Sequence, residues 1–208
     1  MNSISGAADF NNLVLDLLEE MDRETGPYHQ DRQQNYPVGL WWYAEHRFPG
    51  KRPFRTEVAW TERLTELFNN RGMNARSECD YQNSRGRCDV IVNVGWGHPI
   101  WLEVKGSWPW QFDTDKANSS YRKWLRVAAD DIRRKLEVLT AECASAIAFA
   151  LIGFDQPNCG KIITDKNISE IRELTASDAW DAAYREWNVN MSLCFRTRCW
   201  IWTRRLKH

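Results

Sequence analysis

The chain has 208 residues, with 28 basic and 28 acidic side chains, so its formal net charge at pH 7 is zero. This length suits a single domain with a sizeable hydrophobic core. The balanced charge gives no whole-molecule attraction for a polyanion, so any nucleic-acid surface must be local. The six cysteines form no C-x-x-C pair and the four histidines are scattered, which argues against a zinc site. Neither a signal peptide nor a long apolar run is visible, so we expect a cytoplasmic protein without a membrane span.

The first part of the chain predicts a helix followed by a long loop. Within residues 10–21 the apolar side chains recur at helical spacing, which indicates an amphipathic helix with one face on the protein body. Residues 26–53 are rich in Pro, Gly, Gln and aromatic side chains and predict a long ordered loop. A basic cluster near the end of this loop is either a solvated surface or a phosphate contact; it comprises His46, Arg47, Lys51, Arg52 and Arg55.

A second helix is predicted for residues 56–70, with Thr56 as its N-cap. Its buried stripe is expected to contain Trp60, Leu64, Leu67 and Phe68. Glu57 falls on the same stripe, whereas Glu62 and Glu66 lie on another face. A first-turn acid is favoured by the helix dipole, so Glu57 is either a partner of that dipole or a member of a site.

The centre of the chain predicts three strands. Residues 73–81 indicate a first, partly exposed strand, and residues 87–106 indicate a β-hairpin made of two apolar runs, 88–94 and 100–104. Two arginines flank the entrance of this hairpin, Arg85 and Arg87. They either meet a phosphate or pair with Glu78 or Asp80.

Three ionisable side chains interrupt the hairpin: Asp89, Glu103 and Lys105. Side chains alternate along a strand, so Glu103 and Lys105 point to the same face. A three-residue connection, 96–98, would place Asp89 opposite Lys105 on that face, which requires an odd connection or a bulge. The other face is then apolar throughout, with Cys88, Val90, Val92, Val94, Ile100, Leu102 and Val104.

The remaining elements are a helix, a buried strand, a second helix and a last strand. Residues 121–140 predict a helix with many charges outward and with Trp124, Ala128, Ile132, Leu136 and Leu139 inward. Residues 144–154 are continuously apolar and predict a buried strand. Residues 169–187 have a helical pattern, and residues 191–202 predict a strand at a sheet edge.

Residues 196–208 contain no acid and five basic side chains: Arg196, Arg198, Arg204, Arg205 and Lys207. Two tryptophans, Trp200 and Trp202, are interleaved with them. Such a stretch either binds nucleic acid through phosphate contacts and base stacking or charges an edge strand against aggregation.

The order Asp89, thirteen intervening residues, then Glu103-Val104-Lys105 resembles the signature of the PD-(D/E)xK, or restriction-endonuclease-like, nuclease superfamily. Cys88 stands where that family has Pro. The resemblance covers residues 56–154. It implies an α/β fold whose central mixed β-sheet is flanked by helices in α-β-β-β-α-β order.

We therefore expect one domain over residues 1–208, in which residues 56–154 form the nuclease-like core. Residues 1–55 add an N-terminal helix and an aromatic loop, and residues 155–208 add a C-terminal extension with a helix and a strand. Members of the superfamily often place a Glu on the helix before the sheet, and Glu57 is the residue that fits this position.

Three charges on a buried hairpin cost several kcal/mol unless they are paired or bind a metal. Asp89 and Glu103 offer the oxygen ligands that Mg²⁺ prefers, and Mn²⁺ is the alternative ion. The resemblance implies that Glu57 and the Val104 carbonyl are further ligands. Lys105 would orient a water molecule or neutralise the phosphate.

The resemblance thus implies a metal-dependent endo- or exonuclease that hydrolyses phosphodiester bonds, with DNA as the expected substrate, in restriction, defence or repair. Candidate nucleic-acid contacts are Arg52, Arg55, Arg85, Arg87, Arg198, Arg204 and Arg205. The protein would act as a homodimer or within a multi-protein complex. Two alternatives remain: a catalytically inactive module that binds nucleic acid or protein on the same fold, and a purely structural ion network.

Overall fold

The computed structural model describes residues 4–24, 56–81, 86–107, 126–136, 143–155, 162–164, 168–188 and 196–206. Their helices are α1 (Ala7–Glu24), α3 (Thr56–Asn70), the π-helical segment η4 (Asp131–Leu136), which continues an α-helical turn at 126–130, and α6 (Ser169–Leu174). Their strands are β1 (Asn74–Asp80), β2 (Arg87–Asn93), β3 (Ile100–Ser107), β4 (Ala146–Asp155), β5 (Asp181–Asn188) and β6 (Arg196–Arg205).

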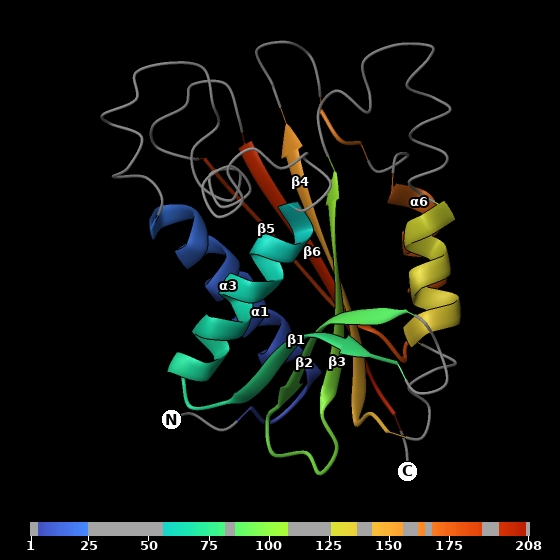
Figure 1. Ribbon diagram of the computed structural model, residues 1–208. Coiled ribbons are helices and arrows are strands. Elements are labelled where there is room, and N and C mark those ends of the chain that lie inside the picture. Colours follow the sequence, from blue (N-terminus) through green and yellow to red (C-terminus); the bar gives the residue numbers. More distant parts are fainter. Residues whose placement is uncertain are drawn as a thin grey trace.

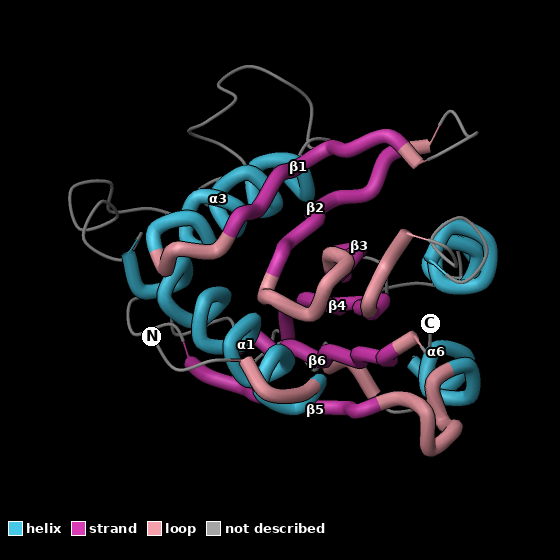
Figure 2. Tube along the Cα trace, turned by 90° about the horizontal axis from the view of Figure 1, so that it is seen from below, coloured by secondary structure: helices cyan, strands magenta, loops and turns pink. Residues whose placement is uncertain are grey.

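The six strands form one mixed sheet in the order β1-β2-β3-β4-β6-β5. Strands β3 and β4 are parallel, and the other neighbours are antiparallel. Helices α1 and α3 cover one face, and η4 and α6 cover the other (Figures 1 and 2). The expected α/β class with a mixed, helix-flanked sheet is therefore confirmed, and from α3 to β4 the elements follow one another as helix, three strands, helix, strand.

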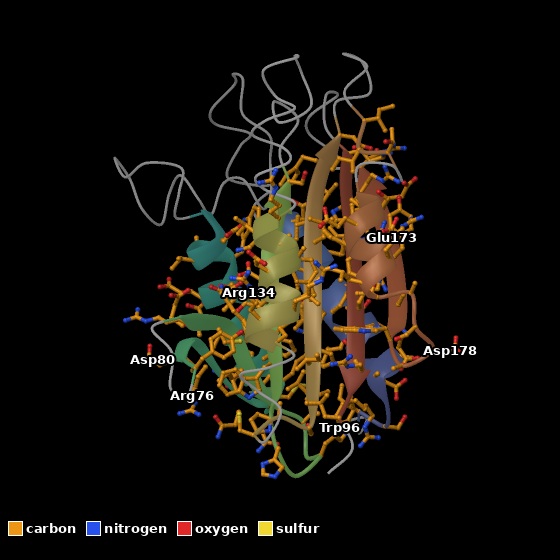
Figure 3. All side chains as sticks on the ribbon, turned by 90° about the vertical axis from the view of Figure 1, so that its right-hand side faces the viewer. Arg76, Asp80, Trp96, Arg134, Glu173 and Asp178 are labelled. Atoms are coloured by element: carbon orange, nitrogen blue, oxygen red, sulfur yellow. The ribbon has the colours of Figure 1, made fainter. Side chains whose placement is uncertain are left out.

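Two hydrophobic cores lie on the two faces of this sheet. On one face the apolar stripes of α1 and α3 pack on Val90, Val92 and Leu102, while on the other face the helical segment 126–136 and α6 pack on Ile91 and Trp101. All ten residues of β4 are buried because alternate side chains enter the two cores, which explains its continuously apolar sequence. Figure 3 looks onto the second face, where the exposed residues Arg134 and Glu173 mark the solvent side of η4 and α6.

The helices expected near residues 10–21 and over residues 56–70 are both present, and the predicted stripe residues of α3 are buried. No helix in the described ranges is long and apolar enough to cross a membrane. The aromatic loop 26–53 lies outside the described residues. So do Arg52, Arg55 and Arg85.

The C-terminal part differs from the sequence prediction in two respects. The helix expected over residues 169–187 ends at Leu174, and residues 181–188 form strand β5. This stretch becomes a strand because it pairs along its whole length with β6, and Ala183 and Trp187 pack against the core beneath α1. Strand β6 consequently lies between β4 and β5, so the prediction of an edge strand is wrong; the sheet edges are β1 and β5.

Candidate active site at the end of strand β3

Strands β2 and β3 pair over only three positions, Val90 with Leu102, Ile91 with Trp101 and Val92 with Ile100. This register places Asp89 at the level of Glu103. The expected connection over residues 96–98 would have placed Asp89 opposite Lys105, so the predicted register is wrong by two residues. The connection is still odd, and Asp89 and Glu103 approach each other as the sequence predicted.

Beyond Leu102 the two strands separate, and carboxylates take the place of the missing strand partner. The backbone N–H of Val104 donates to Asp89 Oδ2 at 2.7 Å. Two residues further along, the N–H of Gly106 donates to Glu57 Oε1 at 2.9 Å. Because N–H and C=O of one strand residue point to the same neighbouring strand, the Val104 carbonyl is directed toward the side of β3 that Asp89 occupies.

Cys88 also departs from the expected alternation at this point. The sequence places it on the same face as Val90 and Val92, but its side chain packs in the second core with Tyr81 and Trp101. Its thiol donates weakly to the carbonyls of Val90 and Leu102, at 3.3 and 3.4 Å. The alternation breaks at Asp89, where the β2–β3 ladder has ended and the β1–β2 ladder is interrupted.

Lys105 joins elements from both faces of the sheet. Its Nζ lies 3.3 Å from Glu57 Oε2 on α3 and 3.2 Å from Asp131 Oδ2 on η4, and its side chain is 13% exposed. Burial alone would lower the pKa of Lys105, but the carboxylates of Glu57 and Asp131, with smaller effects from Asp89 and Glu103, outweigh it and raise the pKa. Lys105 is therefore a fixed cation at neutral pH.

Glu103 is fully buried, and its two oxygens have different surroundings. The Tyr81 hydroxyl donates to Oε1 at 2.5 Å. Oε2 lies 3.8 Å from Lys135 Nζ, and it has no hydrogen-bond partner among the described residues. Burial, followed by repulsion from Asp89, raises the pKa of Glu103 well above its usual range.

Asp89 is half-buried beside Glu103. Burial raises the pKa of Asp89 to about 6, although the nearby Lys105 ammonium and the hydrogen bond from Val104 act in the opposite direction. Both neighbouring carboxyl groups have raised pKa values. The surrounding groups therefore do not fully offset the cost of burying their negative charges.

Sequence reasoning missed three members of this cluster, Tyr81, Asp131 and Lys135. It correctly placed Ala128, Ile132 and Leu136 inward. It predicted many charges of this helix outward and did not single out Asp131 and Lys135, whose side chains are only 5% and 32% exposed. Their spacing carried no distinguishing signal, because Val127 likewise precedes a buried residue of the stripe and is exposed.

The cluster is acidic on balance. Its described members are four carboxylates and two ammonium groups: Glu57, Asp89, Glu103 and Asp131, with Lys105 and Lys135. Two negative charges therefore remain uncompensated when all six groups are ionised, which suits one divalent cation. No group of three or more His, Cys, Asp or Glu side chains in the described ranges is arranged to hold a metal. An ion held here by protein side chains would therefore have one or two carboxylate ligands, the number through which proteins often bind Mg²⁺ together with water and substrate phosphate.

The described arginines with a predicted nucleic-acid role do not gather around this cluster. Arg87 pairs with Asp80, one of the alternatives that the sequence left open. Arg204 and Arg205 lie over the rings of Trp180 and Trp96, toward the end of the sheet where β3 begins.

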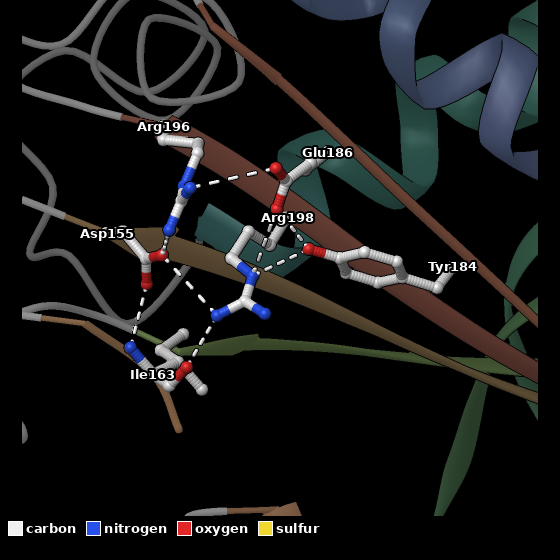
Figure 4. A network of polar contacts seen from close by, with 6 residues as sticks. All are labelled: Asp155, Ile163, Tyr184, Glu186, Arg196 and Arg198. Carbon is white, nitrogen blue, oxygen red and sulfur yellow. Dashed lines mark hydrogen bonds and ion pairs between the residues drawn. The ribbon is translucent and has the colours of Figure 1, made fainter. Parts of the chain in front are cut away.

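Arg198 lies at the same end of the sheet as the site but belongs to a separate ion network. It pairs with Asp155 and Glu186, accompanied by Arg196 (Figure 4). Its guanidinium also lies over the rings of Tyr184 and Trp200. These partners occupy much of its hydrogen-bonding and stacking capacity.

No family model, curated protein or solved structure gave a significant match to this chain. The structure by itself defines an α/β protein with a mixed six-stranded sheet and an acidic, lysine-containing cluster where β2 leaves β3. A fold of this class accommodates many functions. The side chains of the cluster therefore have to support any proposal of function.

Proposed function

We propose that this protein is a metal-dependent nuclease of the PD-(D/E)xK type, which hydrolyses phosphodiester bonds and has DNA as its expected substrate. The observation that carries the proposal is the convergence of Glu57, Asp89, Glu103 and Lys105. They come from α3, β2 and β3 and meet where the β2–β3 ladder ends. These are the residues that the sequence resemblance selects, and their contacts connect residues far apart in the chain.

The two carboxylates with raised pKa values, Asp89 and Glu103, would hold Mg²⁺ or Mn²⁺. Glu57 and the Val104 carbonyl are directed to the same opening of the strands. When bound, the ion would supply stabilisation of phosphoryl charge and a more acidic water molecule. The Glu103 oxygen without a hydrogen bond supports this assignment, because a buried carboxylate oxygen is normally satisfied.

Lys105 acts as a cation in this proposal. Its raised pKa excludes it as a general base at neutral pH, because it does not release its proton there. An ammonium group held between Glu57 and Asp131 can donate to a phosphate oxygen without losing charge, which stabilises negative charge that develops in the transition state.

The principal alternative is a non-catalytic binding module on the same fold. One observation favours it: Glu57 and Asp89 already satisfy backbone N–H groups of β3, a task that a purely structural role would also require. A Mg²⁺ titration by calorimetry separates the two proposals. A degenerate site would show no binding that Asp89→Ala removes.

The proposal is tested by incubating purified protein with linear, circular and branched DNA, and with RNA, in Mg²⁺ or Mn²⁺. We expect Asp89→Ala and Lys105→Ala each to lower the cleavage rate by roughly 10³-fold, because each removes charge stabilisation at the reacting phosphate. Asp80→Ala is the matched control, since Asp80 is an exposed acid at the end of the neighbouring strand β1 and pairs only with Arg87 in the described structure. Equal cleavage by the parent and both site variants would defeat the assignment.

We further propose that the protein acts in the cytoplasm, in restriction, defence or repair, as a homodimer or within a larger complex. The described arginines that were expected to contact nucleic acid lie outside the cluster, which supports a need for additional substrate-binding surface. Gel filtration with light scattering, with and without DNA, measures the oligomeric state. A monomer that cleaves DNA at the full rate would contradict the proposed dimer or complex.

A further inference from the structure

The helical segment opposite β3 presents an ion pair to Glu103 and Lys105. Asp131 and Lys135 lie one turn apart in η4, with 2.6 Å between Asp131 Oδ1 and Lys135 Nζ. The other oxygen of Asp131 lies 3.2 Å from Lys105 Nζ. One nearly buried carboxylate therefore contacts both ammonium groups of the cluster.

The segment that carries this pair, Asp131–Leu136, is π-helical. Short π-helical insertions in α-helices are rare and occur frequently at functional sites. Ile132, directly after Asp131, and Leu136, directly after Lys135, anchor the segment in the second core, so packing holds both charged side chains near β3. The position of the pair is therefore set by the fold.

Lys135 has two carboxylates within reach and is much closer to one of them. Its Nζ is 2.6 Å from Asp131 but 3.8 Å from Glu103 Oε2, beyond hydrogen-bond distance. Because Asp131 engages the ammonium group, Glu103 retains an oxygen without a hydrogen bond. The same oxygen would otherwise be the natural partner of Lys135.

We propose that Asp131 is a positioning residue that restrains Lys135 and keeps it from occupying the metal-binding oxygen of Glu103. This inference rests on the proposed metal site and adds to it. With Asp131 present, Lys135 lies near the site as a cation and Glu103 is left for the divalent ion. Without Asp131, Lys135 moves onto Glu103 and competes with that ion.

The first test measures Mg²⁺ binding by calorimetry, without substrate, in a double-mutant cycle. We expect Lys135→Met to tighten the Kd several-fold, because a competing positive charge is removed, and Asp131→Asn to weaken it roughly tenfold, a usual effect for residues that orient metal ligands. In the double variant the Asp131→Asn penalty should largely disappear, because Lys135 is no longer there to compete.

Arg134→Met is the matched control. Arg134 carries the same charge on the same segment, but it points to solvent and pairs with Asp130. Its substitution should leave the Kd unchanged. An Asp131→Asn penalty of equal size in the presence and absence of Lys135 would overturn the proposal. Should Asp131→Asn fail to fold, Asp131→Ser takes its place in the cycle, and an equal penalty with and without Lys135 would again overturn the proposal.

The second test is a crystal structure of the metal-free Asp131→Asn variant, which depends on neither metal binding nor cleavage. We expect Lys135 Nζ within hydrogen-bond distance of Glu103 Oε2. A Lys135 that stays away from Glu103 contradicts the restraint. If the parent and every variant fail to bind Mg²⁺, the proposed metal site is wrong, and this structure still decides whether Asp131 restrains Lys135.

Discussion

Two fully buried carboxylates on neighbouring strands, Glu103 on β3 and Asp155 on β4, have opposite surroundings. Both oxygens of Asp155 are satisfied: Oδ1 accepts from the Ile163 N–H at 2.8 Å, and Oδ2 accepts from Arg196 at 2.8 Å (Figure 4). Arg198 approaches the same oxygen at 3.5 Å. Glu103 receives one hydrogen bond, from Tyr81, and its nearest described ammonium group is 3.8 Å away.

This difference teaches that burial of an acid does not by itself indicate chemistry. The protein compensates the burial of Asp155 with two guanidinium groups and a backbone amide, as expected of a structural brace. It leaves Glu103 beside a second acid, with a raised pKa and an unsatisfied oxygen. Incomplete compensation, more than burial, is what marks the β3 cluster as a candidate active site.

The largest expected effects, on cleavage and on stability, come from neutralising Glu103 and Asp155 in separate variants. Glu103→Gln should lower DNA cleavage roughly 10³-fold while the free energy of unfolding at pH 7 stays equal or rises, because a poorly compensated charge is removed. Asp155→Asn should instead lower that free energy by about 2–4 kcal/mol, because two arginines lose their buried partner. Urea denaturation and a cleavage assay normalised to folded protein measure the two effects.

Glutamine can still accept from Tyr81, and asparagine can still accept from the Ile163 N–H, so both variants keep one native hydrogen bond. If the two variants destabilised the fold equally and both retained cleavage, the distinction between brace and site would be lost.

A smaller effect is expected from pH. Asp89 and Glu103 have raised pKa values in the folded protein, so between about pH 4 and 6 the folded state binds more protons than the unfolded chain. Their contribution to stability therefore falls as pH rises through this window, by roughly 1–3 kcal/mol for Asp89. We expect saturating Mg²⁺ to restore stability at pH 7.

The measurement is urea denaturation of the parent and of Asp89→Asn at several pH values from 4 to 7.5. The difference between the two proteins separates the contribution of Asp89 to the free energy of unfolding from that of the other carboxylates. Without Mg²⁺ the variant should gain stability relative to the parent as the pH rises. A constant difference across the window would contradict the raised pKa of Asp89.

The smallest effect concerns the strand next to Asp89. Strands β4 and β6 pair at every position beside Asp155, whereas the β1–β2 ladder is interrupted where Glu78 faces Asp89. Glu78 has a φ of 52°, a left-handed backbone conformation that Gly and Asn adopt more readily than Glu does. Glu78→Asn should raise the free energy of unfolding by about 0.5–1 kcal/mol.

Arg76→Asn is the control for this change, because Arg76 is exposed on the same strand and pairs regularly with Ile91. It should leave stability unchanged or lower it slightly. Equal effects of the two substitutions in thermal or urea denaturation would show that the backbone of Glu78 is not strained.

Local periodicity was enough to predict several elements. The stripes of α1 and α3 and the apolar run of β4 each carry their own burial signal, so these elements were predicted close to their observed bounds. The sequence also predicted four members of the cluster, because Asp89, Glu103 and Lys105 stand out from an apolar hairpin and Glu57 lies on the stripe of α3 at the position that the resemblance selects. The burial signals depend only on neighbours within a few residues.

Tertiary structure decided the rest, because the deciding partners are distant in the chain. The pairing of β2 with β3 set the register, and its end at Val90 left N–H groups of β3 that Asp89 and Glu57 bind. Cys88 packs in the second core. Residues 181–188 have helix-forming composition but became a strand because β6 offered backbone partners. Asp131 and Lys135 look like ordinary surface charges until η4 packs against β3 and brings them to Lys105 and Glu103.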